Sequence, residues 1–198
     1  ETLTADVSVP GTVSGSGPVT AIMHNGSVNL VTLRYRLKDI GVQAATAAFK
    51  AGDVEYPAGC FLVEDHADRV RKEVEPLGLR AAALPSKPTV GTVNVDLPRI
   101  AMYSTWMNTE KVGWVRLAFD RFEVPYDLIY KEQARAGDLR AKYDVIVIPH
   151  QTNSGKSIVY EAPKTSRPLP YRKNDRFKTF GMYGETDDVR GGMGLEGA

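Results

Sequence analysis

The chain has 198 residues, enough for one large domain or two small ones, and its 42% hydrophobic and 25% charged residues are ordinary for a globular protein. Its 25 basic and 24 acidic residues leave a net charge of +1, so we expect no binding to nucleic acid or to an anionic membrane surface. The single cysteine excludes an intrachain disulfide framework and a multi-cysteine zinc site. No apolar run approaches the roughly 20 residues of a membrane span, which excludes a transmembrane helix.

Proline and glycine content divides the chain into three parts. Residues 1–18, rich in Gly, Ser, Thr, Val and Pro, predict a linker or an edge strand. Residues 85–98 hold three prolines, a glycine and small polar residues, which indicates an internal boundary. We therefore place a first small α/β unit at residues 19–92 and a second unit at residues 93–198.

The first unit opens on a β-α-β pattern. The segment from Val28 to about Asp39 has leucines on one helical face, and Ser27 before it is a candidate N-cap. Asp65 is the candidate N-cap of a second helix that ends near Leu77. The predicted strands of this unit lie at residues 19–23, 42–49 and 60–63.

The second unit repeats the β-α-β pattern. Residues 109–123 have apolar side chains at three- and four-residue spacing, which predicts a helix. After Asp144, residues 145–148 form the continuous apolar run typical of a strand in a parallel sheet. The predicted elements are strands at 99–103, 126–130 and 144–148, the helix at 109–123 and a helical turn at 138–142. The predicted fold class is therefore α/β, with two small β-α-β-based units.

Two motifs have the spacing of nucleotide-binding loops in part. The sequence Ser-Gly-Lys-Ser at 154–157 follows a predicted strand, but His150 stands where a phosphate-binding loop needs its first glycine. Residues 158–160 after it favour a strand rather than the required helix. The glycines at 192, 194 and 197 lack a preceding strand, so we expect a close backbone turn there rather than a dinucleotide site.

The sequence gives little indication of catalytic or metal-binding groups. None of the three histidines has a partner three residues on that would make a His-x-x-Glu zinc pair. Cys60 lies inside a predicted strand, where a cysteine usually acts as a small buried hydrophobe rather than as a nucleophile.

What remains is a positional prediction. Ligands of parallel α/β proteins bind at the carboxyl ends of the strands, so polar side chains after the predicted strands are candidate ligand-binding residues. The alternative interpretation is that they are ordinary loop residues that make turns and caps. They are Ser104, Thr105, Trp106 and Asn108 after one strand, and His150, Gln151, Thr152 and Asn153 after another.

Several stretches together carry a resemblance to a known family. They are residues 31–37, 56–59, 97–101, 113–116, 143–146 and 187–194. They resemble the region that follows the catalytic domain in large secreted bacterial proteins of the zinc carboxypeptidase family. From about Asp96 onward the chain is similar to a degenerate class I glutamine amidotransferase-like domain, which is flavodoxin-like.

The resemblance implies a secreted or periplasmic parent protein whose zinc is held by histidine and glutamate ligands in another domain. None of those ligands can be placed on this chain, and neither can the Cys–His–Glu set of an amidotransferase, so we expect no cofactor here. The expected partner is the peptidase domain of the same parent.

A flavodoxin-like sheet has about five parallel strands, and only three are predicted in the second unit. We therefore expect this unit to be incomplete at its C-terminus, with the glycines at 191–197 leading into a helix beyond Ala198. An incomplete sheet exposes an apolar edge, which would pair with a second copy or be covered by the 151–198 tail. Residues 158–160 are the tail segment best suited to pair as a strand.

The first functional hypothesis is a noncatalytic accessory region that packs against a zinc peptidase domain or presents substrate to it. The alternative is a small-ligand or carbohydrate-binding module that uses the strand-end loops, where Tyr103 and Trp106 would stack on a ring. A third hypothesis, a divergent amidotransferase-like hydrolase, requires Cys60 to be exposed and thiol-reactive.

Overall fold

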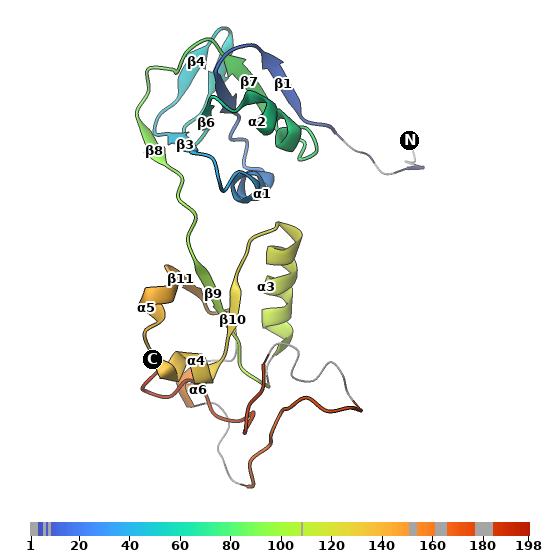
Figure 1. Ribbon diagram of the computed structural model, residues 1–198, viewed down its shortest axis with the longest axis vertical. Coiled ribbons are helices and arrows are strands. Elements are labelled where there is room, and N and C mark those ends of the chain that lie inside the picture. The colour runs from blue at the N-terminus through green and yellow to red at the C-terminus, as the bar shows by residue number, and fades with distance from the viewer. Residues whose placement is uncertain are drawn as a thin grey trace. The chain divides into compact units, whose positions relative to one another are not determined.

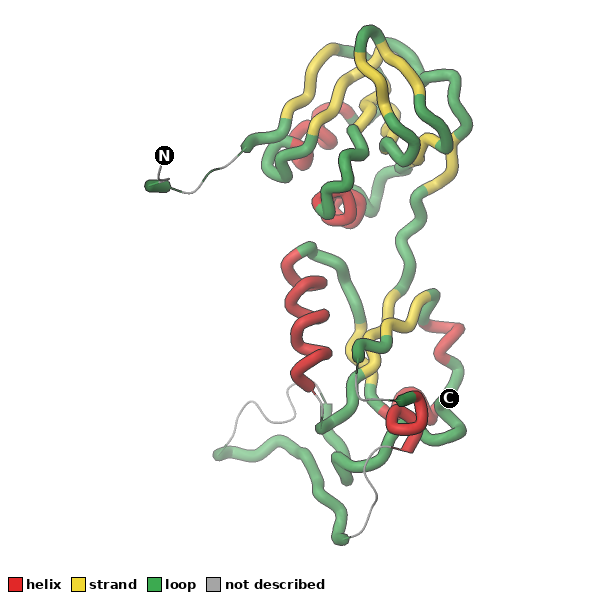
Figure 2. The backbone as a smooth tube through the Cα atoms, turned by 180° about the vertical axis from the view of Figure 1, so that it is seen from behind, coloured by secondary structure: helices red, strands yellow, loops and turns green. Residues whose placement is uncertain are grey.

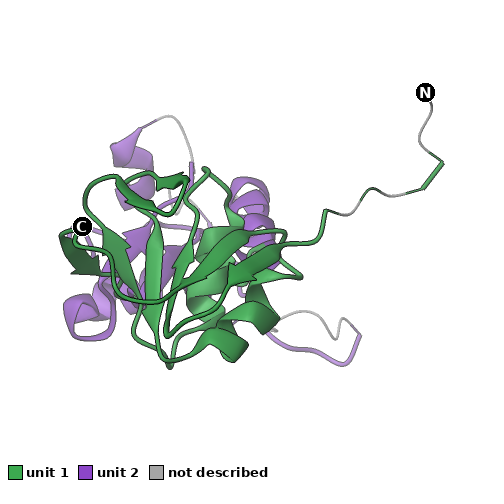
Figure 3. Cartoon of the chain, turned by 90° about the horizontal axis from the view of Figure 1, so that it is seen from above, with its two compact units in different colours: residues 1–97, 122–124 green, residues 98–121, 125–198 purple. Residues whose placement is uncertain are grey.

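The computed structural model describes residues 4, 5, 7, 9–107, 109–150, 154–160, 166–176 and 184–198. They form a mixed α/β structure, which confirms the predicted class (Figure 1). The chain divides into two compact units, unit 1 with residues 1–97 and 122–124 and unit 2 with residues 98–121 and 125–198 (Figure 3). The division between Leu97 and Pro98 lies within the 85–98 segment that the sequence indicated as a boundary, five residues after the end set for the first unit.

Unit 1 is built on a six-stranded sheet of β1 (Thr12–Gly15), β7 (Arg80–Leu84), β2 (Val19–Ile22), β6 (Phe61–Glu64), β3 (Gln43–Ala45) and β8 (Thr92–Asn94), in that spatial order. β1 and β7 are parallel, and every other neighbouring pair is antiparallel. β6 lies between β2 and β3 and is antiparallel to both, so β2 and β3 run parallel to each other. They are the two strands of the predicted β-α-β unit, but they are not neighbours in the sheet.

The N-terminal segment supplies β1 at one edge of this sheet. Just before β1, the N–H of Gly11 donates to the carbonyl oxygen of Glu75 at 2.7 Å. A Cβ at Gly11 would lie 2.3 Å from the carbonyl oxygen of Val74. Only glycine therefore allows the close approach that aligns β1 with β7.

Two helices lie along one side of the strands of unit 1, α1 (Asn29–Arg36) and α2 (Ala67–Val74) (Figure 2). Val28 occupies the N-cap of α1, while Ser27 Oγ accepts a hydrogen bond from the N–H of Asn29 at 3.2 Å. The prediction of Asp65 as the N-cap of α2 was wrong. Asp65 has a φ of 60° because it forms the turn out of β6, and His66 occupies the N-cap.

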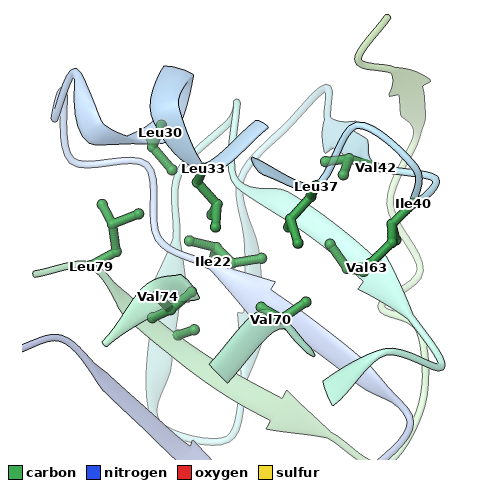
Figure 4. Close-up of a cluster of buried hydrophobic side chains, with 11 residues drawn as sticks. Ile22, Leu30, Leu33, Leu37, Ile40, Val42, Val63, Val70, Val74 and Leu79 are labelled. Atoms are coloured by element: carbon green, nitrogen blue, oxygen red, sulfur yellow. The ribbon is translucent and has the colours of Figure 1, made fainter. Parts of the chain in front are cut away.

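The main apolar core of unit 1 lies between these helices and the sheet (Figure 4). Leu30, Leu33 and Leu37 project from α1 and its C-terminal end toward Ile22 and Val63 of the sheet, and all five are buried. Burying a leucine, isoleucine or valine side chain stabilises a fold by about 1.5–3 kcal/mol.

A second apolar cluster covers the opposite face of the sheet. It contains a hairpin of β4 (Phe49–Ala51) and β5 (Val54–Tyr56), in which the rings of Phe49 and Tyr56 stack with centroids 4.9 Å apart. The single strand predicted at 42–49 is therefore two strands. At the end of β3, the N–H and the Oγ of Thr46 both donate to the carbonyl oxygen of Gly91, and the chain then turns into the β4–β5 hairpin.

Unit 2 is built on three parallel strands, β10 (Asp127–Ile129), β9 (Ile100–Tyr103) and β11 (Val145–Val147), in that spatial order. The structure confirms all three strands predicted in this unit, with shorter bounds. The connecting helices are α3 (Thr109–Arg121) between β9 and β10, and α4 (Lys131–Ala136) and α5 (Leu139–Lys142) between β10 and β11. The helix α3 and the turn at α5 were predicted, but α4 was not.

The structure contradicts the predicted strand at residues 158–160, which belong to the helix α6 (Gly155–Tyr160). The reason lies near the C-terminus of the chain. The N–H groups of Met193 and Gly194 donate to the carbonyl oxygens of Ile158 and Val159 at 3.1 and 2.9 Å. These bonds satisfy carbonyls that a helix end otherwise leaves without partners, and Gly192 provides the close backbone approach.

Candidate ligand site at the strand ends of unit 2

The order of the strands in unit 2 defines where a ligand would bind. The connections from the central strand β9 lead first to β10 on one side and then to β11 on the other, so the topological switch point lies between β9 and β11. Ser104, Thr105 and Trp106 follow β9, and His150 follows β11 on the exposed surface. The predicted residues Asn108, Gln151, Thr152 and Asn153 lie outside the described residues.

Ser104 and Thr105 are buried at this end of the sheet. The N–H of Ser104 donates to the carbonyl oxygen of Ile129 at 2.9 Å and so continues the pairing between β9 and β10. The Ser104 hydroxyl donates to the carbonyl oxygen of Thr105 at 2.9 Å. The proton of this hydroxyl is thus used within the loop.

Trp106 contacts other aromatic rings of unit 2. Its ring stacks on Tyr130 with centroids 3.8 Å apart and an interplanar angle of 7°, and it lies tilted against Tyr171 at 5.5 Å. Its Nε1–H donates to Glu132 Oε2 at 3.1 Å. Tyr130 therefore covers one face of the indole, and Tyr103, the other ring expected to stack on a ligand, is buried.

Helix α4 holds the C-terminal segment of the chain through its charged side chains. The buried Lys131 donates its Nζ hydrogens to the carbonyl oxygens of Asp188 and Arg190. Arg135 donates to the carbonyl oxygens of Gly192 and Met193 at 2.6 and 3.2 Å. These contacts were not predicted, because helix α4 itself was not predicted. The available signal was the four-residue spacing of Lys131 and Arg135, which places both side chains on one face of a helix.

The same segment contains an ion pair between the half-buried Asp188 and the buried Arg190. Arg190 Nε lies 2.9 Å from Asp188 Oδ1, and the guanidinium also donates to Ser166 Oγ and to the carbonyl oxygens of Ser166 and Arg167. The hydrogen bonds from Arg190 hold the pKa of Asp188 well below its usual range. The pair fixes the 166–169 segment to the C-terminal segment.

A cavity of about 290 Å³ lies between α4 and this segment, and its lining is charged. Glu132 joins the cavity to the strand ends, because it accepts a hydrogen bond from Trp106 and another from Thr186 Oγ at 2.6 Å. On the far wall, Arg172 and Asp187 form an ion pair. The lining residues are Lys131, Glu132, Arg135, Arg172, Glu185, Thr186, Asp187 and Asp188.

Unit 1 has a separate polar cavity of about 370 Å³ at the β3, β6 and β8 side of its sheet, which was not predicted. Arg34 lies in its wall and donates from Nε to the carbonyl oxygen of Val95 at 2.6 Å. Burial lowers the pKa of Arg34, and the nearby charge of Asp96 opposes that shift. The remaining polar lining comes from Gln43, Glu64, His66 and Asn94.

Cys60, required by the hydrolase hypothesis, is fully buried in the second apolar cluster of unit 1. Its Sγ accepts a hydrogen bond from the N–H of His24 at 3.2 Å, and burial raises the pKa of the thiol. An exposed, reactive Cys60 is therefore contradicted. Within the described ranges, no group of His, Cys, Asp and Glu is placed to hold a metal ion.

None of the helices in the described part of the chain has the length and apolar character to cross a bilayer. Comparisons with protein-family models, with curated proteins and with solved structures return no match to this chain.

Proposed function

We propose that this chain is a noncatalytic accessory region of a secreted or periplasmic protein of the zinc carboxypeptidase family. In this proposal it packs against the peptidase domain of the parent or presents substrate to it. The parent's zinc and its ligands lie in that domain. The family and the location rest on the resemblance of the sequence stretches described above.

The observation that carries the noncatalytic role is how unit 2 uses its charged side chains. Lys131, Arg135 and Arg190 all donate to backbone carbonyls of the chain itself. In an active site such cations would face a substrate and stabilise charge that develops in the transition state. Here they hold segments of unit 2 together.

The strand order of unit 2 supports the flavodoxin-like assignment. If its strands are numbered along the chain, the spatial order is 2-1-3, which is how the flavodoxin-like order 2-1-3-4-5 begins. This order favours a degenerate class I glutamine amidotransferase-like domain over a dinucleotide-binding domain, whose first three strands lie in the order 3-2-1.

An activity assay tests the proposal. The purified chain, supplied with zinc, is incubated with peptides that differ in their C-terminal residue, and release of that residue is measured. We expect no release above the buffer control. Turnover that a chelator abolishes would show that the chain is itself a metallopeptidase. The upstream reading frame provides an independent check, since the proposal requires a His-x-x-Glu followed by a distant histidine.

A second candidate function is binding of a small ligand or carbohydrate at the strand ends of unit 2. It is favoured by the charged cavity that Glu132 joins to Trp106. In the Trp114→Phe protein, Trp106 is the one remaining tryptophan, so its fluorescence reports on this site. We expect a saturable change with a peptide or a sugar. Binding heat that survives both Trp106→Ala and His150→Ala would contradict this site.

A further inference from the structure

The polar cavity of about 370 Å³ in unit 1 has no role in the function proposed above. It lies where β3 begins and where β6 and β8 end, at one end of these three neighbouring strands (Figure 1). Val42, Leu62 and Val95 supply its apolar lining. Its volume is near the lower end of the range for ligand sites, which suits a small molecule.

Arg34 of α1 contributes a fixed positive charge to this cavity. Its Nε donates to the carbonyl oxygen of Val95 at 2.6 Å, and its Nη1 donates to the carbonyl oxygen of Leu37 at 2.9 Å. These two bonds orient the guanidinium group and leave Nη2 without a hydrogen-bond partner among the described residues. Because an arginine presents its N–H groups as a rigid fork that matches a carboxylate, Nη2 is available to an anionic group.

The charge of Arg34 is only partly compensated by the protein. Burial lowers the pKa of Arg34, and the opposing effects of Asp96 and Tyr35 are smaller. In the part of the chain that the structure describes, the Asp96 carboxylate has neither an ion-pair nor a hydrogen-bond partner, Arg34 included. Burying a charge is costly unless the charge is paired, so a further anion beside Arg34 would be stabilising.

The other carboxylate of the lining, that of Glu64, is already paired. Lys87 Nζ donates to Glu64 Oε1 at 2.8 Å and to Gln43 Oε1 at 2.6 Å. The Gln43 amide in turn donates to Asn94 Oδ1 at 3.4 Å. Among the described lining residues, Asp96 is therefore the one carboxylate that remains for a positively charged group of a ligand.

The arrangement of these charges indicates the class of ligand. Glu64 and Asp96 would repel a multiply charged anion such as phosphate, and Arg34 would repel a simple cation. A neutral ligand would displace water from Arg34 and Asp96 without pairing either charge. A small zwitterion, with an ammonium group and a carboxylate close together, pairs with both side chains at once.

We propose that this cavity binds a free α-amino acid, with its carboxylate on Arg34 Nη2 and its ammonium group on Asp96. In this arrangement the side chain of the ligand lies against Val42, Leu62 and Val95. The site belongs entirely to unit 1. It is therefore an additional function, which does not depend on the role proposed for the chain or on its parent family.

A titration followed by NMR tests the class of ligand. The isotope-labelled full chain receives glycine, leucine, phenylalanine, glutamine, aspartate or lysine, each up to about 10 mM. At least one of them should cause saturable shifts of the Arg34 Nε and Asn94 side-chain signals. The N-acetyl and amide derivatives of that amino acid, which lack one charge each, should bind about tenfold more weakly or worse. Equal binding of these derivatives, or no saturable shift with any of the six, would overturn the proposal.

A variant tests the contact with the ammonium group. Asp96→Asn removes the charge of an exposed side chain, so the fold should remain intact, which circular dichroism confirms. In this variant the preference for the free amino acid over its N-acetyl derivative should disappear. Asp39→Asn is the matched control, because Asp39 is also exposed but lies outside the lining, and it should keep the preference. An unchanged preference in Asp96→Asn would contradict binding at this cavity.

Discussion

In unit 1 the sheet is covered by apolar side chains on both faces, by α1 and α2 on one and by the β4–β5 hairpin on the other. The sheet of unit 2 has a much smaller apolar cluster, to which α4 and the C-terminal segment contribute Ala134 and Met193. Here Lys131, Arg135 and Arg190 connect distant segments through hydrogen bonds to backbone carbonyls. The two units thus combine apolar burial and charge-assisted hydrogen bonds in different proportions.

Two intrinsic probes distinguish the units. Cys60, the one cysteine, is buried in unit 1, and both tryptophans, Trp106 and Trp114, belong to unit 2. Thiol labelling therefore follows the unfolding of unit 1, and tryptophan fluorescence follows that of unit 2. The variants of the first three predictions are measured in urea with both probes.

The largest expected effect is a cavity in the core of unit 1. Leu33 is fully buried, so Leu33→Ala should lower the free energy of unfolding reported by Cys60 labelling by about 2–5 kcal/mol. The tryptophan transition should move less. Val31→Ala on the exposed side of the same helix is the control and should stay within about 0.5 kcal/mol of wild type. An equal shift of both probes in Leu33→Ala would show that the units unfold together.

The second prediction removes the positive charge of the buried Lys131 in unit 2. Lys131→Met leaves two carbonyl oxygens without their donor, so the free energy of unfolding reported by tryptophan fluorescence should fall by roughly 1.5–3 kcal/mol. Cys60 labelling should be nearly unchanged. Lys111→Met, at an exposed position of α3, should have little effect on either probe. A variant as stable as wild type would mean that the apolar cluster alone holds α4 to the C-terminal segment.

The third prediction uses acid. Because Arg190 depresses the pKa of Asp188 in the folded chain, this pair stabilises unit 2 above the unfolded aspartate pKa of about 3.9. The contribution of the pair is lost as the pH falls below the unfolded aspartate pKa toward the lower pKa of Asp188 in the folded chain. The tryptophan transition should therefore weaken below about pH 4, and less steeply in Asp188→Asn than in wild type. Glu110→Gln, an exposed carboxylate of α3, should keep the wild-type slope.

The smallest expected effect concerns the strand-end site. Trp106→Phe keeps an aromatic ring beside Tyr130 but loses the donor to Glu132, so unit 2 should lose about 0.5–1.5 kcal/mol, measured by circular dichroism. Trp114→Phe is the control, because Trp114 is exposed and should tolerate the change. If Trp106→Phe costs nothing, the indole is available for a ligand, which favours the second candidate function.

The apolar pattern of the sequence was sufficient for the elements whose contacts follow that pattern. The strand β2, the three strands of unit 2 and the helix α3 were all predicted from apolar runs or from three- and four-residue spacing. The candidate residues at the strand ends followed as well, because the carboxyl ends of parallel strands meet at one edge of a sheet, whereas the strand order that defines the switch point came from the structure. The positions of Ser104, Trp106 and His150 after their strands were therefore accessible from the sequence.

Tertiary structure decided the elements that depend on partners far along the chain. Residues 158–160 have the composition of a strand, yet they are helical, and Met193 and Gly194 satisfy the end of that helix. Lys131 appeared to be an ordinary charged residue until the fold buried it against the carbonyls of Asp188 and Arg190. A hydrogen bond between a side chain and a distant backbone carbonyl leaves no periodic pattern in the sequence, because every residue type offers the same acceptor.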